Sequence, residues 1–297
     1  MKIIRKIKEK YHQFKTHPVT KGNEFMGLYN YISFNIINRL FREIHYTWIE
    51  GLKFVASKGD AGIVGNIYFG LYEFEESIFL LHFIEKEDLF LDIGANVGHY
   101  SLLMSGLKNC KSIAVEPVPK HHTQLMKLVH LNHLEPLIDA RNIGVSDKEG
   151  ELYFSTDRST MDSVVSEKYK NSIRVSVATI DSIVSNFTPI AIKIDVEGYE
   201  KYALEGATKT LQNANLKVVV LELNQSGLKY GFNDEVIYKT ILEYGFKPFS
   251  YDQITRKLVK LEGYNRHQFN TLFVRDEDFV AERLLKSRKI SIRGKKI

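Results

Sequence analysis

The sequence predicts an α/β protein in which a mostly parallel sheet is covered by helices on both faces. Residues 89–93 form an apolar run, residues 94–98 form a turn bracketed by glycines, and an amphipathic segment follows from Tyr100. This order is typical of a buried strand, a tight turn and a helix. Further apolar runs alternate with helical segments along the chain, which indicates a parallel sheet between two layers of helices.

Acidic or polar residues close several of the predicted strands. They are Asp92, Glu116, Asn142, Asp195 and Glu222. In open α/β sheets, ligands bind beyond the carboxyl ends of the strands, where the strand order reverses. These five side chains are therefore the first candidates for a binding site.

The first 84 residues precede the strand that leads into the glycine turn. Residues 1–22 are basic and predict a surface helix, and residues 29–48 place apolar side chains at helical spacing. We expect that second helix to pack on its own domain, with a membrane-surface role as the alternative. A short strand is expected at residues 53–57 and a helix at residues 72–84. Glycines predict turns between them, at Gly59, Gly62, Gly65 and Gly70.

After the glycine turn, strands and helices alternate in order. Strands are expected at residues 112–115, 138–143, 151–155, 173–177, 189–194, 217–223, 246–251 and 269–274. Helices are expected at residues 119–132, 200–211 and 234–244. Pro119 suits the first turn of its helix, and Gly245 ends the last of the three.

Charge is concentrated at the two ends of the chain. The 297 residues carry a net charge of +5, but residues 1–16 alone carry +5 and residues 286–297 carry +6, which leaves −6 for the body. Basic ends on an acidic body predict weak attraction to an anionic surface such as phospholipid or RNA, or solvated tails without a partner.

The composition also indicates the cellular compartment in which the protein occurs. Cys110 is the single cysteine, so disulfides and cysteine-based metal sites within the chain are excluded. No apolar run reaches the roughly 18 residues that a membrane span needs, and the first ten residues lack the apolar core of a signal peptide. We expect a cytoplasmic protein.

The sequence of the glycine turn restricts the class of ligand that could bind there. A dinucleotide-binding turn has the pattern G-x-G-x-x-G, but Ala95 follows Gly94 here and the middle glycine is missing. The carboxylate of Asp92 would repel a pyrophosphate and suits a ligand with an ammonium group. Glu116, at the end of the next strand, is suited to accept hydrogen bonds from both hydroxyls of a ribose. S-adenosylmethionine combines an amino-acid end with a ribose and has this shape.

Four motifs resemble one enzyme family. They are FLDIGANVGHYS at residues 90–101, AVEPVP at 114–119, GVSDKEG at 144–150 and IKIDVEGYE at 192–200. In this order they resemble the FkbM-type S-adenosylmethionine-dependent methyltransferases, and the upstream GNIYFGLYEFEE at 65–76 is similar to the lead-in of some members. The resemblance implies a Rossmann-like methyltransferase fold, with a mostly parallel seven-stranded sheet whose last strand is reversed. It also implies O-methylation of a hydroxyl, often on a sugar or a secondary metabolite.

The resemblance divides the chain into three parts. We expect a basic, helical extension over residues 1–64, a Rossmann-like methyltransferase domain over residues 65–275, and a C-terminal helix with a basic tail over residues 276–297.

The cofactor site is assigned from the motifs. Gly94, Asn96 and Gly98 would hold the amino-acid end together with Asp92, and Glu116 would hold the ribose, with Pro117 beside it. Asn142 is the candidate near the adenine, and Ser146 and Asp147 are the alternatives there. The alternative for the glycines is a purely structural turn.

The catalytic residues are assigned to the end of the fourth strand of the sheet and to a later strand. Methyl transfer to oxygen is an in-line displacement that depends on alignment and on a base for the hydroxyl proton. Asp195 and Glu197 are the candidates, and Glu222 is a further one; the alternative is that the first two only complement a helix dipole. No metal is assigned, although Asp195, Glu222 and Asn224 offer oxygen ligands that suit magnesium.

Two features near the site have open roles. His99, directly after the turn, is expected to be a partly exposed residue at the start of a helix. Aromatic side chains of the lead-in could line a sugar-accepting cleft together with Glu73 or pack in the core, namely Tyr68, Phe69 and Tyr72.

The leading hypothesis is an O-methyltransferase that acts on a hydroxyl of a glycan, a sugar or another small molecule. An N-methyltransferase on nucleic acid is the first alternative, although the chain lacks the Asn/Asp-Pro-Pro-aromatic box that holds a flipped base in many such enzymes. We therefore expect no specific nucleic-acid partner. A non-catalytic binding module and a nicotinamide oxidoreductase are the remaining alternatives. The intact turn and Asp195 disfavour the former, and the missing glycine disfavours the latter.

Overall fold

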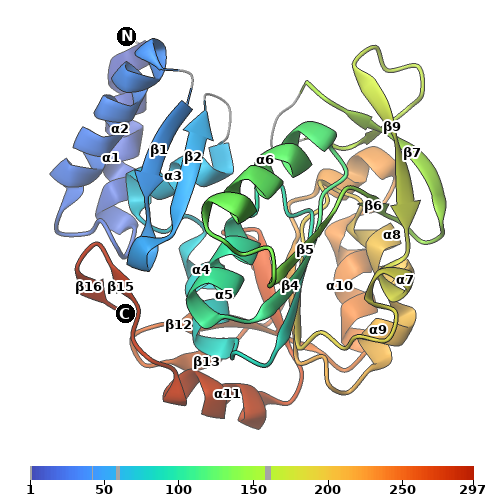
Figure 1. Ribbon diagram of the computed structural model, residues 1–297. Helices are drawn as coiled ribbons and strands as arrows, with labels where there is room; N and C mark the ends of the chain where they lie inside the picture. Colours follow the sequence, from blue (N-terminus) through green and yellow to red (C-terminus); the bar gives the residue numbers. More distant parts are fainter. Residues whose placement is uncertain (1, 42, 58–60, 158–161) are drawn as a thin grey trace.

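Eight strands form the central sheet of the computed structural model, which describes residues 2–41, 43–57, 61–157 and 162–297 (Figure 1). Their order across the sheet is β13-β12-β14-β11-β10-β3-β4-β5. The bounds are β3 Leu89–Ile93, β4 Lys111–Val115, β5 Ile138–Arg141, β10 Ala191–Ile194, β11 Val218–Glu222, β12 Lys247–Asp252, β13 Lys257–Lys260 and β14 Asn270–Val274.

The strand directions confirm the predicted fold class. β5, β4, β3, β10 and β11 are parallel, and β14 runs antiparallel to both of its neighbours, β11 and β12. This is a mostly parallel sheet whose last core strand is reversed. The sheet has one strand more than the seven predicted, because β13 pairs antiparallel with β12 as a hairpin at the edge. The segment is four residues long with a lysine at each end, so its sequence gives little strand signal.

Helices cover both faces of the sheet, as predicted. Phe90, Ala191 and Val218 pack on one face against α4 Phe74–Phe83, α5 His99–Lys108, α6 Pro119–Leu131 and α11 Glu277–Lys286. Leu91 and Ile192 point to the other face, with α7 Ile180–Val184, α8 Glu200–Glu205, α9 Thr208–Gln212 and α10 Asp234–Glu243. The strands alternate between two buried faces, which explains why they read as continuous apolar runs.

A small second sheet lies beside the carboxyl ends of the main strands. It contains β6 Gly144–Val145, β7 Gly150–Ser155, β8 Val164–Val165 and β9 Ser172–Ala178. β7 and β9 pair antiparallel over six residues, which confirms the two strands predicted there.

The N-terminal region differs from two predictions. Its elements are α1 Lys2–Thr16, α2 Glu24–Leu40, β1 Glu43–Thr47, the short helix η1 Ile49–Gly51, β2 Lys53–Ser57 and α3 Ala61–Phe69. The predicted helix over residues 29–48 is wrong in its last part, because Glu43–Thr47 pairs antiparallel with β2 instead of continuing α2. The alternating pattern of EIHYT suits a half-buried strand.

The predicted turns at Gly62 and Gly65 are also wrong, because both glycines lie inside α3. At Gly65 the absence of a side chain serves close packing, since a Cβ there would lie 2.6 Å from Cγ of Tyr72. Gly70 does end the helix, with φ of +87°. Gly59 lies outside the described residues, and the expected boundary between residues 64 and 65 falls within α3.

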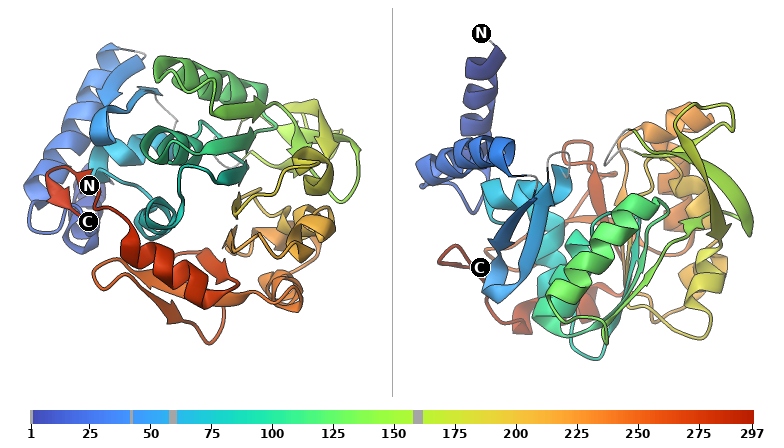
Figure 2. Two further views of the ribbon diagram at one scale, coloured as in Figure 1. Left: turned by 60° about the horizontal axis from the view of Figure 1, so that its bottom comes forward. Right: turned by 45° about the horizontal axis from the view of Figure 1, so that its top comes forward.

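The basic C-terminal segment is a docked hairpin, so the prediction of a tail is wrong. After α11 the chain forms β15 Ser291–Ile292 and β16 Lys295–Lys296, which pair antiparallel and pack beside the N-terminal elements (Figure 2). Arg293 donates a hydrogen bond to the carbonyl of Tyr68 at 3.0 Å, and Lys295 donates to the carbonyl of Lys21 at 2.7 Å. Ile290 and Ile292 are buried, which anchors the hairpin. Separately, none of the helices among the described residues is both long and apolar enough to cross a bilayer.

Candidate active site

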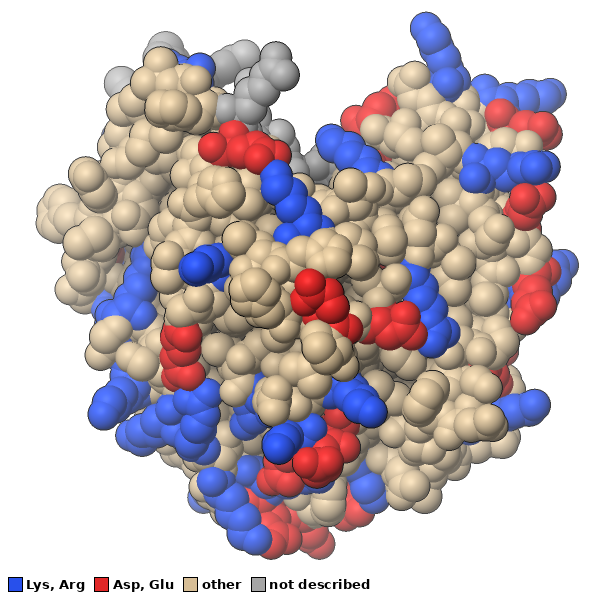
Figure 3. All heavy atoms as spheres, in the orientation of Figure 1, with Lys and Arg blue, Asp and Glu red and all other residues tan. Residues whose placement is uncertain are grey.

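A cavity lies at the carboxyl ends of β3, β4, β10 and β11. Its walls combine the glycine turn, the start of α5 and the small sheet with Gly62 and Ile63 of α3. The space-filling view shows the surface hollowed between the side that carries β1 and β2 and the side that carries β7 and β9 (Figure 3). This is the position at which parallel α/β sheets bind their ligands.

The glycine turn forms a wall of bare backbone. The amides of Gly94 and Ala95 both donate to the carbonyl of Val115, at 2.9 and 3.0 Å. Gly94 has φ of +81°, and a Cβ on it would lie 1.8 Å from the carbonyl oxygen of Asp195. Gly98 has φ of +90°, and a Cβ there would lie 2.4 Å from Leu125. Only glycine fits at either position.

Glu116 is held at the edge of this turn by backbone amides. Its Oε2 accepts a hydrogen bond from the amide of Asn96 at 2.8 Å, and its Oε1 accepts one from the amide of Val118 at 2.9 Å. The Nδ1 atom of His121 lies 3.6 Å from the same Oε1. Glu116 is 4% exposed and lines the cavity, so a buried carboxylate lies directly beside the turn.

The predicted cofactor residues divide into two groups. Gly94, Asn96, Glu116 and Pro117 line the cavity together. The remaining four lie outside the described lining: Gly98, Asp92, Asn142 and Asp147.

The contacts of the second group support the turn or its surroundings. Asp92 accepts hydrogen bonds from the amide and the hydroxyl of Ser101, at 3.0 and 2.6 Å, and so holds the start of α5. Burial raises the pKa of Asp92 to about 6. Asn142 donates to the carbonyls of Glu116 and Pro117, and the exposed Asp147 accepts from the hydroxyl of Ser146.

An apolar wall completes this end of the cavity, and the sequence analysis did not assign it. It consists of Val145, Phe154 and Val164, one from each of three strands of the small sheet. The alternation in residues 151–155 was the available signal, because it places Phe154 on the inner face of β7.

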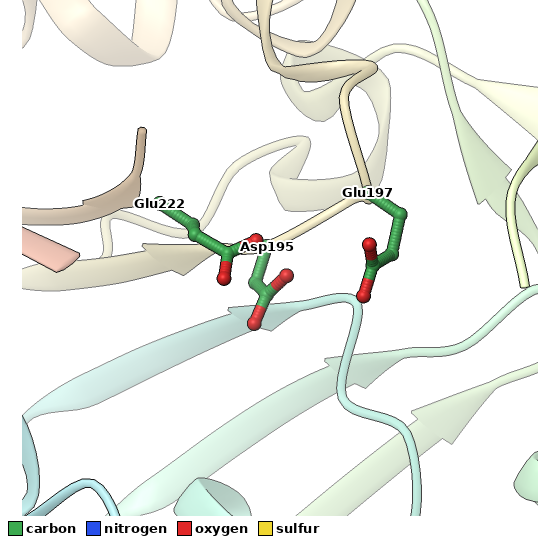
Figure 4. Close-up of side chains that lie close together, drawn as sticks. All are labelled: Asp195, Glu197 and Glu222. Carbon is green, nitrogen blue, oxygen red and sulfur yellow. The ribbon is translucent and has the colours of Figure 1, made fainter. Parts of the chain in front are cut away.

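Three carboxyl groups converge at the other end of the cavity. Asp195 follows β10, Glu197 lies in the next turn with φ of +52°, and Glu222 ends β11. One oxygen from each side chain lies within 4.8 Å of the other two, and the three groups point toward one another (Figure 4). The structure therefore brings together all three residues predicted to be catalytic.

Crowding and burial favour the protonated forms of Glu197 and Glu222. Burial and the nearby Asp195 raise the pKa of Glu197 to about 8. The same two causes raise the pKa of Glu222 well above its usual range. The Oε2 atom of Glu222 is buried and has no hydrogen-bond partner among the described residues. The group is thus equipped to hold and exchange protons near neutral pH.

Lys193 neutralises part of this charge, and the sequence analysis missed it. Its Nζ atom lies 3.0 Å from Oδ2 of Asp195, and its side chain is 1% exposed. Burial alone would lower the pKa of Lys193, but Asp195, Glu73 and Glu222 together raise it above its usual value. A signal was present, because strand alternation places residues 193 and 195 on the same side of the backbone.

Two residues of the lead-in, at residues 65–76, also line the cavity. Tyr72 and Glu73 line the cavity, and Glu73 accepts a 2.7 Å hydrogen bond from the hydroxyl of Tyr100. Tyr68 and Phe69 are instead buried in the core. Tyr72 and Glu73 therefore line the cavity, whereas the alternative of core packing is confirmed for Tyr68 and Phe69.

His99 is fixed from both sides of its ring. The amide oxygen of Asn66 accepts from the backbone of Tyr72, so its Nδ2 donates to Nδ1 of His99 at 3.0 Å. The Nε2–H group then donates to the hydroxyl of Ser77 at 2.9 Å. Burial lowers the pKa of His99 to about 3, so the ring is neutral and positions the start of α5.

Glu200 shapes the turn that carries Glu197. Its Oε1 accepts from the amides of Val196 and Gly198, at 3.2 and 3.1 Å. Asn224, considered above as a metal ligand, accepts from the amide of Ser226 and lies outside the described lining. The oxygens of Asp195, Glu197 and Glu222 are close enough to hold a metal ion, but the ammonium of Lys193 already supplies positive charge to that cluster.

The cavity fits S-adenosylmethionine. The backbone of the glycine turn forms part of its wall, the buried carboxylate of Glu116 suits ribose hydroxyls, and the wall around Phe154 is apolar. The carboxyl cluster lies beside the turn, because the carbonyl of Asp195 packs against Gly94.

Comparisons with known proteins agree with this description. The Methyltransferase FkbM domain matches residues 92–248, more than half of the chain. The hexuronic acid methyltransferase AglP of Haloferax volcanii is 25% identical over 143 residues, which are 47% of this chain and 58% of that relative. The chain thus matches less than two thirds of the length of this relative.

Solved structures with a similar chain path are distant in sequence. The rRNA methylase of Streptococcus thermophilus is 13% identical, with 67% of this chain and 91% of that chain covered and a TM-score of 0.39. TYW2 of M. jannaschii, in complex with AdoMet, is 12% identical, with 79% and 87% covered and a TM-score of 0.39. On the domain match, the chain belongs to the FkbM methyltransferase family.

Proposed function

We propose that this methyltransferase methylates a hydroxyl group of a sugar, either in a glycan or in a smaller molecule. The observation that carries the proposal is the convergence of Asp195, Glu197 and Glu222 beside the glycine turn, with Lys193 buried beneath them. Such a group can orient a hydroxyl and remove its proton.

The proposed cofactor site uses the first end of the cavity. Glu116 would accept hydrogen bonds from the ribose, the 94–98 turn with Asn96 would hold the amino-acid end, and Phe154 with its apolar neighbours would contact the adenine. Asp92 and Asn142 would act indirectly, through the start of α5 and the loop at Glu116. When bound, S-adenosylmethionine supplies an activated methyl group on a sulfonium.

The proposed proton acceptor is the Asp195–Glu197 pair. The ammonium of Lys193 lies 3.0 Å from the carboxylate of Asp195, and a protonated Glu222 would donate a hydrogen bond to Asp195. Glu197 has a pKa near the working pH, so it would take up the proton that the acceptor hydroxyl releases. The pair would also align that hydroxyl for in-line transfer.

Two arguments favour a sugar as the acceptor. Carboxylates accept hydrogen bonds from neighbouring hydroxyls, of which a sugar offers several, and Tyr72 adds an aromatic surface at the same end. The relative from Haloferax volcanii has a name that specifies a hexuronic acid acceptor.

An acceptor screen tests the proposal. The purified chain would be incubated with S-adenosylmethionine carrying an isotopically labelled methyl group, and with matched hexosides, hexuronides, an RNA and a protein extract. We expect label on a sugar oxygen, located by mass spectrometry after alkaline treatment to exclude methyl esters. Label on a nucleic-acid or protein nitrogen, with none on any sugar, would overturn the acceptor class.

A further inference from the structure

Helix α2 exposes an apolar face to solvent. Its inner face is buried through Gly27 and Phe34, yet its outer face is apolar as well. The exposed side chains include Phe25 and Leu40, at 74% and 76%, and extend between them through Met26, Tyr29, Ile32, Ile36 and Ile37.

These side chains form one continuous stripe. Residues 25, 29, 32, 36 and 40 recur every three or four positions and therefore lie on one side of the helix. No charged residue occurs between Glu24 and Arg39. In the space-filling view the surface over α2 shows hardly any charged side chains (Figure 3). Contiguous exposed apolar patches of this kind mark interaction sites.

The neighbouring helix α1 is basic. It packs closely on α2, since a Cβ on Gly27 would lie 2.8 Å from the ring of Phe14, and Tyr11 lies 6.0 Å from the ring of Phe25. Its exposed side chains include Arg5, Lys6, Lys8 and Lys15. Residues 1–41 contain eight lysines and arginines against two glutamates.

We propose that the outer face of α2 and the exposed basic side chains of α1 together form a docking surface for an anionic phospholipid bilayer. The apolar stripe would enter the boundary between headgroups and acyl chains, and the lysines of α1 would contact lipid phosphates. Asn30, Asn35 and Asn38 interrupt α2, so the helix would lie in the plane of the interface.

Charge favours a bilayer over a second copy of the chain. Two α2 stripes could cover each other, but this would bring two basic α1 helices close together, and like charges repel. An anionic surface matches both features. The right-hand view shows α1 at the outer edge of the molecule, away from the central sheet (Figure 2).

Vesicle flotation of the full chain tests the surface. We expect binding to phosphatidylcholine vesicles that contain phosphatidylserine, much weaker binding to phosphatidylcholine alone, and loss of binding at high salt. The triple variant Phe25→Ser, Ile36→Ser, Leu40→Ser should bind at least about tenfold more weakly, because it removes apolar area that would be buried in lipid. Charge reversal at Arg5, Lys6 and Lys8 to Glu should have a similar effect.

Matched variants outside α1 and α2 control for nonspecific hydrophobic and electrostatic binding. Ile254→Ser, Val259→Ser, Leu285→Ser removes apolar side chains that are 86%, 48% and 62% exposed, and Lys148→Glu, Lys170→Glu, Lys257→Glu reverses exposed lysines. Both should leave flotation unchanged, and cofactor affinity by calorimetry should be unchanged in all four variants.

Absence of binding to the anionic vesicles, or equal losses in test and control variants, would overturn the proposal. A concentration-dependent dimer that the α2 variant abolishes, without vesicle binding, would assign the stripe to a second copy of the chain. The proposal does not depend on the acceptor, so its failure would leave the proposed sugar methylation intact.

Discussion

Glutamates and aspartates occur at both ends of the cavity, but their surroundings differ. Glu116 accepts hydrogen bonds from two backbone amides, at 2.8 and 2.9 Å, and is thereby fixed in one orientation. Asp195, Glu197 and Glu222 instead face one another, and Lys193 is paired with Asp195 at 3.0 Å. Backbone amides hold a carboxylate for binding, whereas crowded carboxyls compete for protons. The same side-chain chemistry therefore suits cofactor binding at one end and proton transfer at the other.

The substitution Asp195→Asn should have the largest effect, and it tests whether the carboxyl cluster serves proton transfer rather than cofactor binding. We expect turnover to fall roughly a hundred- to ten-thousand-fold, the range associated with loss of a general base. Cofactor affinity should change much less, because the carboxylate of Asp195 is assigned to the acceptor hydroxyl and that of Glu116 to the cofactor. Turnover comes from a labelled-methyl assay and affinity from calorimetry, with the exposed Asp139→Asn as the matched control.

Lys193 loses its nearest carboxylate in this variant, so thermal unfolding would be recorded alongside to verify the fold. If a folded Asp195→Asn protein kept full turnover, Asp195 would not take part in proton removal.

The substitution Glu116→Gln should have the opposite signature. It removes the charge that accepts hydrogen bonds at the cofactor end, so we expect S-adenosylmethionine to bind about tenfold to a hundredfold more weakly. Turnover at saturating cofactor should change much less. Calorimetry measures the affinity, and the exposed Glu135→Gln is the matched control. An unchanged affinity for S-adenosylmethionine would show that Glu116 does not hold the cofactor.

The smallest effect concerns stability as a function of pH. Burial raises the pKa of Glu76 and of Glu197 to about 8 and that of Glu200 to about 7, above the ordinary value of 4.5 that applies to the unfolded chain. The folded state therefore holds protons that the unfolded state has released, and stability is lost as the pH rises through these values. We expect the melting temperature to fall between about pH 6.5 and pH 8 and to level off above that range.

Glu197→Gln sharpens that prediction. The variant cannot ionise at position 197, so its melting temperature should fall less steeply as the pH rises. At pH 9 its free energy of unfolding should exceed that of the wild type by roughly 1–3 kcal/mol. Burial lowers the pKa of His17 and His82 to about 4, so these histidines remain neutral in the fold and reduce stability only below about pH 6.5. Equal slopes for variant and wild type between about pH 6.5 and pH 8 would contradict the raised pKa of Glu197.

The fold was predictable where local signals agreed with the tertiary arrangement. The apolar strands, the glycine turn and the reversed last strand correspond to strong periodicities and to family motifs. The failures lie where long-range pairing overrides local pattern. Glu43–Thr47 continues a helical spacing but pairs with β2, and Gly65 reads as a turn but packs under Tyr72.

The two basic ends of the chain also show that local sequence does not reveal long-range contacts. Their sequences carry almost equal charge, yet Arg288 pairs with Glu50 and Arg293 with backbone carbonyls, while Lys6 and Lys8 remain exposed. Charge along a sequence does not reveal whether a partner lies opposite it, because that partner comes from a distant part of the chain.

The sequence by itself determined the fold class, the glycine turn after the first strand of the main sheet, and the carboxylates at the strand ends. These follow from periodicity and residue type, which act locally. Only the tertiary structure decided that Asp92 turns toward Ser101, that Lys193 pairs with Asp195, and that Phe154 completes the apolar wall. Those contacts depend on how neighbouring strands and helices align, and register and packing are properties of the whole molecule.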